Sequence, residues 1–476
     1  MVKNSRILYE LSSDRGLILM IKFNNRTNLM EAIEFNYLLN DVKNPNLYRD
    51  VYPYDEIPKV TFNHTRVPIH MPDDIFMTDT SFRDGQQSRA PYTVEQMVTL
   101  YQMLHRLGGP QGKIRQSEFF LYSKKDREAV YRCLELDYEF PEVTAWIRAN
   151  NDDFQLVHDM GLKETGILVS CSDYHIFKKL KMSRQEAFDH YLGIVKQALD
   201  VGIIPRCHLE DITRADFYGF VVPFAMALKA LSDESGVPIK VRACDTMGYG
   251  VTYPGAALPR SVQGIIFGLN HHAQIPSELI EWHGHNDFYK AVNNSSNAWL
   301  YGAGGVNCTL LGIGERTGNT PLEAMVFEYA QLRGTLDGMD PTVITEIASY
   351  YEHEIGYKVA TNTPFIGKNF NVTRAGIHAD GLLKNEEIYN IFDTEKFLNR
   401  PPLVSISAHS GLAGIAHWVN TYYQLKGTDA VNKNSPLVCK LKSFVDHEFE
   451  QGRVGVMSDE ELVAYVDFLK SNGRGY

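Results

Sequence analysis

Two histidines separated by one residue, His283 and His285, form the arrangement in this sequence that is best suited to holding a metal ion. They follow the apolar pair Leu279 and Ile280, as at the end of a strand, where side chains two residues apart point to the same face. One buried histidine is usually a hydrogen-bonded core residue, whereas two on one strand face can reach the same ion. The segment therefore predicts metal binding.

Arg83 and Asp84 lie where another predicted strand passes into a loop, and Gln87 close behind offers an amide for substrate binding. An Arg-Asp pair is often only a surface ion pair. In a closed parallel barrel, however, the first and seventh strands point their C-terminal ends into the same bowl, so Asp84 can join His283 and His285. Two neutral imidazoles and one carboxylate suit a divalent ion and leave coordination positions open for a substrate.

The glycine-rich run 312–319 contains Gly312, Gly314, Glu315 and Asn319. Such glycines can serve only to permit a tight turn, and a glycine-rich loop by itself is weak evidence for a phosphate site. Its position after the eighth predicted strand of a barrel makes the evidence for a phosphate site stronger, because loops after strands seven and eight often hold phosphates. We therefore predict that Gly312, Gly314 and Glu315 contact a cofactor.

Short apolar runs alternate with segments of helical periodicity from about residue 71, and this rhythm predicts the elements that position these side chains. The predicted strands are 75–79, 114–121, a segment near 144, 166–170, 203–209, 239–242, 278–282 and 306–310. The predicted helices between them include 93–107, 183–201, 215–231 and 287–301. Eight such repeats indicate an α/β fold, a (β/α)₈ TIM barrel with its active site at the C-terminal ends of the strands.

Two further regions flank the barrel, which we expect to span residues 71–335. Residues 1–70 are predicted to be an N-terminal extension that packs against the barrel or a partner subunit, and they contain no motif that indicates chemistry. Residues 336–476 are predicted to form a smaller, mainly helical C-terminal domain that contributes to the active site.

The composition is that of a globular protein, with 476 residues of which 44% are hydrophobic and 22% charged. The net charge of -11 argues against nucleic acid or an anionic membrane surface as the main partner. The six cysteines are scattered singly, which indicates neither a disulfide framework nor a zinc ribbon. No apolar run approaches the roughly 18 residues of a membrane span, and no secretory signal is evident, so we expect a cytoplasmic protein.

Three segments together resemble those of a known enzyme group: Ser-Phe-Arg-Asp-Gly-Gln-Gln at 81–87, His-Gly-His-Asn-Asp at 283–287 and Gly-Ile-Gly-Glu-Arg-Thr-Gly-Asn at 312–319. In this order and separation they are similar to the metal-dependent (β/α)₈ acyltransferases that include isopropylmalate, homocitrate and Re-type citrate synthases. Segments at 172–180, 210–214 and 245–248 fit the same pattern, and the resemblance runs from about residue 74 to the end of the chain.

The resemblance implies a Claisen condensation of acetyl-CoA with a 2-oxo acid, assisted by Mn²⁺, Mg²⁺ or Zn²⁺. It implies that Asp84, His283 and His285 bind the ion, with Asn319 as a nearby ligand. It further implies that Arg83 holds the 2-oxo acid, that Thr246 contacts its carboxylate, that Glu210 lines the same pocket and that Glu315 lies near the acetyl group.

A base must remove a proton from the methyl group of acetyl-CoA before that carbon can attack. His378 is a candidate for this base, with its ring oriented by Tyr389 or by a carboxylate, and the resemblance implies that His378 and Tyr389 reach an active site. In the family, these residues of the second domain often reach the active site of the neighbouring subunit, so a homodimer is expected.

The 2-oxo acid can be apolar or a dicarboxylate, and a buried second carboxylate needs cationic partners. The polar segment 113–125 with Arg115, together with Arg206 and His208, favours a dicarboxylate. The long N-terminal region and the segment 83–91 resemble Re-type citrate synthases, which favours oxaloacetate, with citrate and CoA as products. Homocitrate synthase, acting on 2-oxoglutarate, and 2-isopropylmalate synthase, acting on 2-oxoisovalerate, stay open as alternatives.

Three other functions compete with this prediction. A lyase of the hydroxymethylglutaryl-CoA type relies on a cysteine in the glycine-rich loop, where this chain has Glu315 and Arg316, with Cys308 upstream. Biotin-dependent carboxyltransferases share the first motif and the His-x-His, but this chain has no Met-Lys-Met biotin acceptor. A non-catalytic binding barrel would be favoured by a broken ligand set, whereas the predicted ligands are all present.

Overall fold

The computed structural model describes residues 21–24, 29–32, 37–57, 59–148, 153–373, 378, 381–382 and 384–471. The chain divides into two compact units, Met1–Asp340 and Pro341–Tyr476, whereas the sequence rhythm predicted a boundary at 335. The predicted N-terminal extension lies partly outside the described residues. Its first described part is a short antiparallel pair of strands, β1 (Ile21–Asn24) and β2 (Leu29–Ala32).

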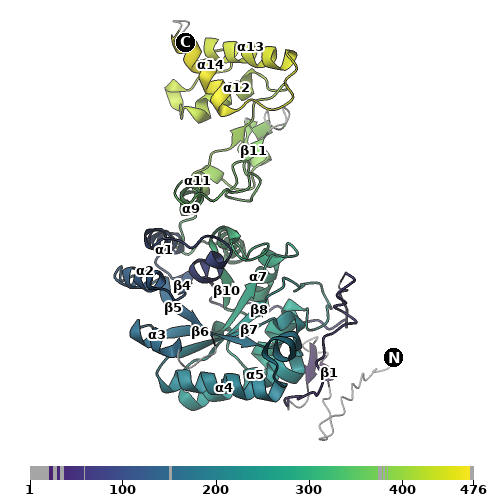
Figure 1. Ribbon diagram of the computed structural model, residues 1–476. Helices are drawn as coiled ribbons and strands as arrows, with labels where there is room; N and C mark the ends of the chain where they lie inside the picture. Colours follow the sequence, from purple (N-terminus) through teal and green to yellow (C-terminus); the bar gives the residue numbers. More distant parts are fainter. Residues whose placement is uncertain are drawn as a thin grey trace, which may run out of the picture. The chain divides into compact units, whose positions relative to one another are not determined.

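Eight parallel strands of the first unit close into a barrel in the order β10-β3-β4-β5-β6-β7-β8-β9 (Figure 1). The strands are β3 (Phe76–Asp79), β4 (Ile114–Phe119), β5 (Glu142–Ile147), β6 (Glu164–Ser170), β7 (Ile204–Glu210), β8 (Lys240–Asp245), β9 (Ile280–Gly284) and β10 (Gly305–Cys308). The predicted (β/α)₈ barrel is confirmed, including its third repeat near residue 144.

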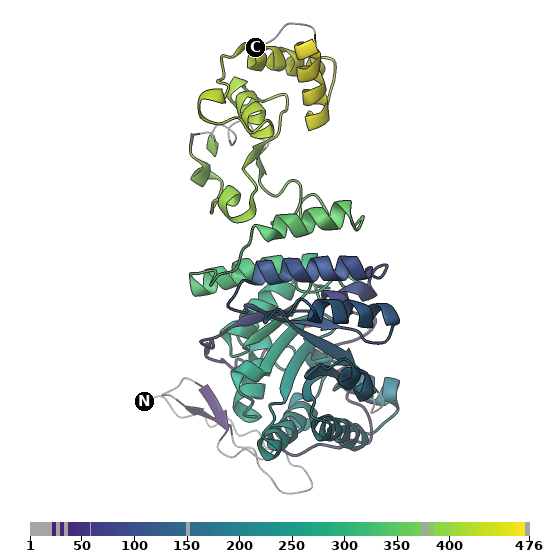
Figure 2. The same cartoon turned by 90° about the vertical axis from the view of Figure 1, so that its left-hand side faces the viewer.

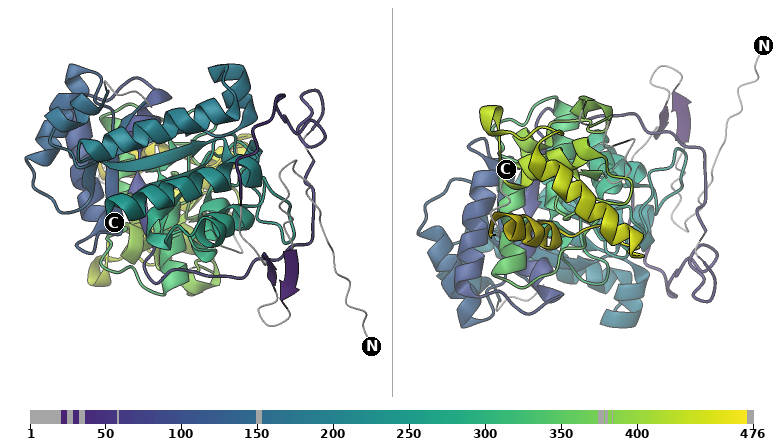
Figure 3. Two further views of the ribbon diagram at one scale, coloured as in Figure 1. Left: turned by 90° about the horizontal axis from the view of Figure 1, so that it is seen from below. Right: turned by 90° about the horizontal axis from the view of Figure 1, so that it is seen from above.

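Helices follow the strands and surround the barrel (Figure 3). They are α1 (Val94–Gly108), α2 (Lys124–Leu134), α3 (Asp153–Asp159), α4 (Arg184–Asp200), α5 (Val222–Ser235), α6 (Val262–Phe267), α7 (Ala291–Leu300) and α8 (Leu322–Arg333). Capping boxes formed by Thr93 with Gln96 and by Ser183 with Glu186 define where α1 and α4 begin.

The helix predicted over 215–231 begins differently, as a π-helical turn, η4 (Phe217–Val221), that continues into α5. Pro223 lies at the start of α5 and has no N–H group to donate to the carbonyl of Gly219, four residues earlier. That carbonyl instead accepts a hydrogen bond from the backbone N–H of Asn40, at 2.9 Å. A residue of the N-terminal extension therefore completes the start of this helix.

The interior of the barrel is charged, unlike the branched apolar layers that are usual in this architecture. Arg206 and Arg242 are fully buried. Arg206 pairs with Glu118 at 2.8 Å and with Glu164 at 3.0 Å, and Arg242 pairs with Glu118 at 3.0 Å and with Glu281 at 2.6 Å. Buried charges are tolerated only when they are paired, so these residues must be held as one network.

Residues 37–57 and 59–70, here called the N-terminal strap, run along one side of the barrel (dark purple in Figure 3). The strap contacts the loops that follow three neighbouring strands. Asn46 N donates to Asp173 Oδ2 after β6 at 2.7 Å, and the Tyr52 hydroxyl donates to the Thr213 carbonyl after β7 at 2.6 Å. The carbonyl of Thr61 accepts from the N–H of Ala257 after β8, at 2.9 Å. The strap therefore belongs to the barrel unit.

The second unit is mainly helical, and Figure 2 shows its elements in green to yellow. Its elements are α9 (Val343–His353), β11 (Val372–Thr373), α11 (Thr394–Leu398), β12 (Leu403–Val404), α12 (Leu412–Tyr422), α13 (Pro436–Glu450) and α14 (Asp459–Ser471). Buried side chains of α12, α13 and α14 form a core that includes Trp418, Leu441 and Val466. In the part of the chain that the structure describes, no helix has the length and apolar character of a membrane span.

Glu323 in the first turn of α8 is only 5% exposed, and its carboxylate accepts a hydrogen bond from the N–H of Leu311 at 3.1 Å. Burial raises the pKa of Glu323 from 4.5 to about 7. A carboxyl group with a raised pKa in the folded state contributes stability that is fully present below the unfolded pKa. This contribution is lost as the pH rises through the folded pKa.

Glu323→Gln keeps an acceptor for Leu311 but cannot ionise. Between about pH 5 and about pH 8 we expect the free energy of unfolding of this variant to fall less than that of the wild type, by about 2 kcal/mol. Urea denaturation followed by circular dichroism at both pH values measures this difference. Glu234→Gln, at an exposed position of α5, is the control, and a Glu323→Gln protein with the pH dependence of the wild type would contradict the expectation.

Candidate functional site

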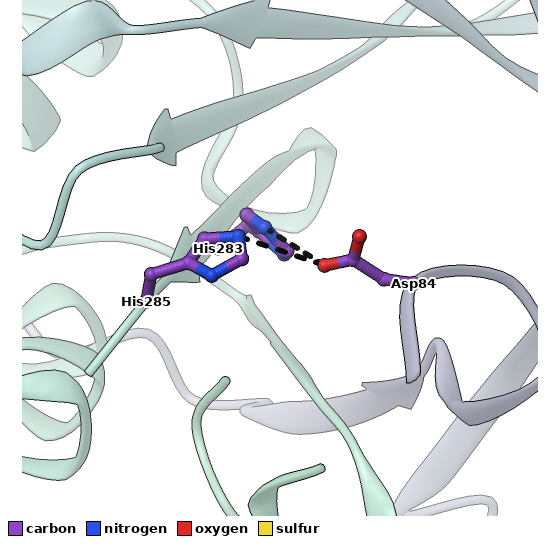
Figure 4. A group of neighbouring side chains, drawn as sticks. All are labelled: Asp84, His283 and His285. Atoms are coloured by element: carbon purple, nitrogen blue, oxygen red, sulfur yellow. Dashed lines mark ion pairs between the residues drawn. The ribbon is translucent and has the colours of Figure 1, made fainter. Parts of the chain in front are cut away.

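Asp84, His283 and His285 converge at the C-terminal end of the barrel, and all three are buried (Figure 4). Asp84 lies in η1 (Ser81–Gly85), the short turn after β3, while His283 lies in β9 and His285 directly follows that strand. Asp84 Oδ2 is 3.6 Å from Nε2 of each histidine. Two donors that are each about 2.1 Å from one ion lie about 3.0–3.4 Å apart, so the three side chains need to move by only a few tenths of an ångström to share an ion.

The tautomer of His283 provides a test of whether an ion fits here. Its Nδ1 lies 2.8 Å from Asn307 Oδ1, and Asn307 Nδ2 in turn donates to Thr78 Oγ1 at 2.9 Å. Because Asn307 Oδ1 is an acceptor, Nδ1 of His283 carries the proton and Nε2 presents a lone pair toward the Asp84 carboxylate. Two electron-rich groups facing each other in a buried site repel, and a cation between them removes this repulsion.

The charge states of the three side chains are those of metal ligands. Burial lowers the pKa of His283 to about 3, against the opposing effect of Asp84, and burial also lowers the pKa of His285. Burial acts to raise the pKa of Asp84, but the charge of Arg83 and the hydrogen bond from Asn319 act against it, and that pKa lies below its usual range. At neutral pH the set is therefore two neutral imidazoles and one carboxylate, which is the form that binds a divalent ion.

Asn319 reaches the same site from the glycine-rich loop. Its Nδ2 donates to Asp84 Oδ2 at 2.6 Å, and its Oδ1 is buried with no hydrogen-bond partner among the described residues. A side chain on Gly314 would place its Cβ 1.7 Å from this oxygen, so only glycine lets Asn319 occupy the position. The structure thus brings together all four predicted metal ligands, and their role as ligands stays a prediction.

Arg83 lies beside the cluster with two of its nitrogens already engaged. Its Nε donates to Glu118 Oε1 at 2.8 Å and its Nη1 to Asp84 Oδ1 at 3.0 Å. No hydrogen bond to another described residue engages Nη2. The guanidinium is therefore fixed in orientation while one nitrogen stays able to bind an oxygen of a ligand.

Glu118 organises the cations beneath the site. Its carboxylate accepts from Arg83, Arg206 and Arg242, and also from Thr80 Oγ1 at 3.0 Å. Burial acts to raise the pKa of Glu118, but Arg242 and Arg83 outweigh it and hold that pKa well below its usual range. Glu118 is thus an anion that neutralises the buried arginines.

Glu210, at the end of β7, faces a separate group of side chains. It contacts His175 Nδ1 at 2.8 Å, Ser170 Oγ at 2.5 Å and Lys179 Nζ at 3.3 Å. His175 and Lys179 lie on η2 (Tyr174–Leu180), after β6. Burial acts to raise the pKa of Glu210, but the hydrogen bond with His175 contributes to lowering it to about 2, so the group is ionised.

Thr246 connects two loops at the mouth of the barrel. Its hydroxyl accepts from the N–H of Asp211 at 2.9 Å, and its carbonyl accepts from Arg316 Nη2 at 2.5 Å. Arg316 also pairs with Asp287 at 2.8 Å, which ties the glycine-rich loop to the loop after β9. In the glycine-rich loop, Glu315 is exposed, while Gly312 has a φ of 62° that favours glycine.

The structure does not bring the other predicted substrate contacts into this cluster. Arg115 lies near the N-terminal end of β4 and pairs with Asp74 at 2.9 Å, and Gln87 is exposed. Arg206 is committed to the interior network. His208 lies 3.4 Å from a Glu118 oxygen, and burial lowers its pKa to about 3, so it is neutral.

His378 and Tyr389 belong to the second unit. Their rings lie 4.7 Å apart at an angle of 45°, and both side chains are exposed. The two rings therefore contact each other, and the catalytic role of His378 and Tyr389 stays a prediction.

Sequence reasoning missed Glu118, Asn307 and His175. The signal for Asn307 was available, because β10 is paired in register with β9 and places Asn307 opposite His283. Glu118 and His175 lie in segments that were recognised, but their partners are far away along the chain. Only the closed barrel identifies them.

A family profile described as HMGL-like matches residues 74–350 of this chain. The chain belongs to the HMGL-like family. Every strand of the barrel and the whole cluster around Asp84 lie within the matched region of this HMGL-like protein.

Relatives cover almost the entire chain. The citrate (Re)-synthase of Clostridium kluyveri is 60% identical over 92% of this chain and 96% of that protein. The citrate (Re)-synthase of Syntrophus aciditrophicus is 56% identical over 91% of this chain and 69% of that protein. The 2-phosphinomethylmalate synthase of Streptomyces hygroscopicus is 35% identical over 90% of this chain and 98% of that protein.

His285→Ala removes one imidazole from the cluster of this HMGL-like protein. We expect the affinity for Mn²⁺ to fall at least about 100-fold, because even changes outside the ligand set of a metal cost about 10- to 100-fold. Titration calorimetry of the purified variant measures the affinity, and its circular dichroism verifies the fold. His158→Ala, on the exposed side of α3, is the control, and wild-type metal affinity in His285→Ala would refute the assignment.

Glu118→Gln removes the negative charge shared by three buried arginines. We expect the free energy of unfolding to fall by about 3–5 kcal/mol, since breaking a buried ion pair leaves uncompensated charge. Denaturant unfolding measures this loss, with Glu135→Gln at the exposed end of α2 as the control. Equal stability of Glu118→Gln and the wild type would contradict the central role of this carboxylate.

Proposed function

We propose that this protein is a citrate (Re)-synthase that condenses acetyl-CoA with oxaloacetate to give citrate and CoA. The observation that carries the proposal is the 60% identity, over 92% of this chain, to a citrate (Re)-synthase. The cluster of Asp84, His283 and His285 beside Arg83 supports it, because a 2-oxo acid needs a cation and a fixed donor at its carbonyl.

We assign the binding of one divalent ion, Mn²⁺, Mg²⁺ or Zn²⁺, to Asp84, His283 and His285, with Asn319 alongside. When bound, the ion supplies Lewis-acid polarisation of the C2 carbonyl of the 2-oxo acid. Asn307 keeps the proton of His283 on Nδ1, so Nε2 always faces the ion site.

Arg83 stabilises the charge that develops on the carbonyl oxygen as the acetyl carbon attacks. Its Nε and Nη1 are held by Glu118 and Asp84, so Nη2 is aimed without any rearrangement at the moment of reaction. A donor that is positioned in advance and shielded from water is worth far more than one in bulk solvent.

Thr246 and Glu210 form the remaining wall of the 2-oxo acid pocket in this proposal. Thr246 is fixed by the backbone of Asp211, and Glu210 is kept ionised by His175 and Lys179. Arg115 and Arg206 are engaged in their own ion pairs, so the choice of oxaloacetate over other 2-oxo acids rests on the relatives rather than on these two arginines.

We assign the removal of the acetyl-CoA methyl proton to His378, with Tyr389 orienting its ring, and contact with the acyl-CoA to Gly312, Gly314 and Glu315. The exposure of both aromatic rings is compatible with a base that meets its substrate at the active site of a neighbouring subunit. We therefore propose a homodimer in which the second unit completes the site. We also propose that the protein is cytoplasmic.

CoA release from acetyl-CoA with oxaloacetate, 2-oxoglutarate or 2-oxoisovalerate tests the proposal. We expect kcat/KM for oxaloacetate to exceed that for either competitor by at least about 100-fold, a difference of roughly 3 kcal/mol in the transition state. The assay contains Mn²⁺, and a chelator-treated sample is the control. A higher kcat/KM for 2-oxoglutarate or 2-oxoisovalerate would reassign the enzyme to homocitrate or isopropylmalate synthesis.

A further inference from the structure

The N-terminal strap, in which the sequence indicated no chemistry, holds the loops that carry Thr246 and Asp211. We propose that Tyr52 of the strap is a positioning residue for the 2-oxo acid pocket and that it acts through Thr213 and Asp245 on Thr246. The inference deepens the proposed function and rests on it for the identity of the substrate.

Tyr52 is almost completely buried between two barrel loops. It is 4% exposed, and its hydroxyl donates to the carbonyl of Thr213 at 2.6 Å. Its ring lies 5.5 Å from that of Tyr249, and Tyr249 lies 5.1 Å from Phe288, three residues beyond His285. One side chain of the strap thus contacts the loops after β7 and β8, and through Tyr249 it connects to the loop after β9.

The segment that Tyr52 holds is strained and adjoins the pocket. Asp211 directly follows Glu210 and has a φ of 65°, in the left-handed region that costs free energy for any residue except glycine. Thr213 lies two residues later, in η3 (Ile212–Arg214). The bond from Tyr52 therefore fixes the chain at the point where its strained conformation must be maintained.

Thr213 passes this restraint to the loop of Thr246. Its hydroxyl donates to Asp245 Oδ1 at 2.8 Å, and the N–H of Asp211 donates to Thr246 Oγ1 at 2.9 Å. The Asp245 carboxylate also accepts the backbone N–H groups of Tyr249 at 2.9 Å and Gly250 at 2.8 Å. Asp245 is fully buried, so the bonds to its carboxylate are shielded from bulk water.

The connection continues to the metal ligands. The carbonyl of Asp245 accepts the N–H of His285 at 3.3 Å. The position of the His285 backbone thus depends on the same loop as the position of Thr246. A shift of the Thr213 segment would move the substrate wall relative to the ion site.

The strap itself is firmly attached, so Tyr52 has a rigid base. Arg184 is fully buried and makes two bonds of 2.8 Å to Asp173 and one of 2.8 Å to Asp216. It also donates to the carbonyl of Asn40 at 2.9 Å. Since a buried, fully paired guanidinium is costly to disrupt, the strap is anchored here independently of Tyr52.

Tyr52→Phe removes the bond to Thr213 and keeps the ring. We expect KM for oxaloacetate to rise about 10-fold and kcat to fall about 10-fold, with KM for acetyl-CoA unchanged, because a misplacement of about 1 Å costs up to about 100-fold in rate. Hydrogen–deuterium exchange of residues 211–216 and 246–250 should be faster than in the wild type. Tyr54→Phe is the control, since Tyr54 is in the same strap but is 94% exposed.

The two readouts separate a positioning role from a structural one. Faster exchange combined with the kcat and KM values of the wild type would overturn the proposal. Exchange of both segments at the wild-type rate would also overturn it. A lower melting temperature with kcat and both KM values unchanged per folded molecule would also overturn it by assigning Tyr52 a structural role.

If the wild type rejects oxaloacetate, the proposed function fails. The same comparison is then made with the 2-oxo acid that the enzyme accepts, and exchange still decides whether Tyr52 holds the loops.

Discussion

The Glu118 carboxylate, buried among three arginines, is the interaction on which the rest of this barrel depends. Arg83, Arg206 and Arg242 cannot be buried unless an anion lies among them, because the cost of removing a charge from water far exceeds the free energy of folding. Glu164 also pairs with Arg206, and Glu281 also pairs with Arg242, so the positive charge of the interior is neutralised. The barrel can therefore close only when the buried arginines of its interior are paired with these carboxylates.

The same network of buried charges connects the barrel interior to the cluster of Asp84, His283 and His285. Arg83 pairs with Glu118 of the interior and with Asp84 of the candidate ion site, so its guanidinium links the two. A carboxylate that held only Arg83 would leave the side chain free to rotate, whereas Glu118 is itself immobilised by Arg206 and Arg242. The position of the Arg83 guanidinium is thereby set by residues of the barrel interior.

The fold and the candidate ion site follow from local patterns in the sequence. His283 and His285 share a face because strand side chains alternate, and the barrel rhythm brings Asp84 to the same end. Arg206 looked equally suited to bind substrate, because the sequence displays a cation on a strand but not its partner Glu118, 88 residues away. Tyr52 was missed for the same reason, since Thr213 lies 161 residues beyond it.

Strained backbone occurs in several loops that follow the barrel strands, at the end of the barrel that carries the candidate site. Four non-glycine residues with positive φ follow strands β7, β9 and β10: Asp211, Tyr289, Leu311 and Arg316. Each such residue costs of order 1–3 kcal/mol and persists only where its surroundings hold it. Thr246 holds Asp211 and Glu323 holds Leu311, both through backbone N–H groups. These loops start at strand ends that the paired charges of the interior help to hold, as Glu118 holds Arg83 in the turn after β3.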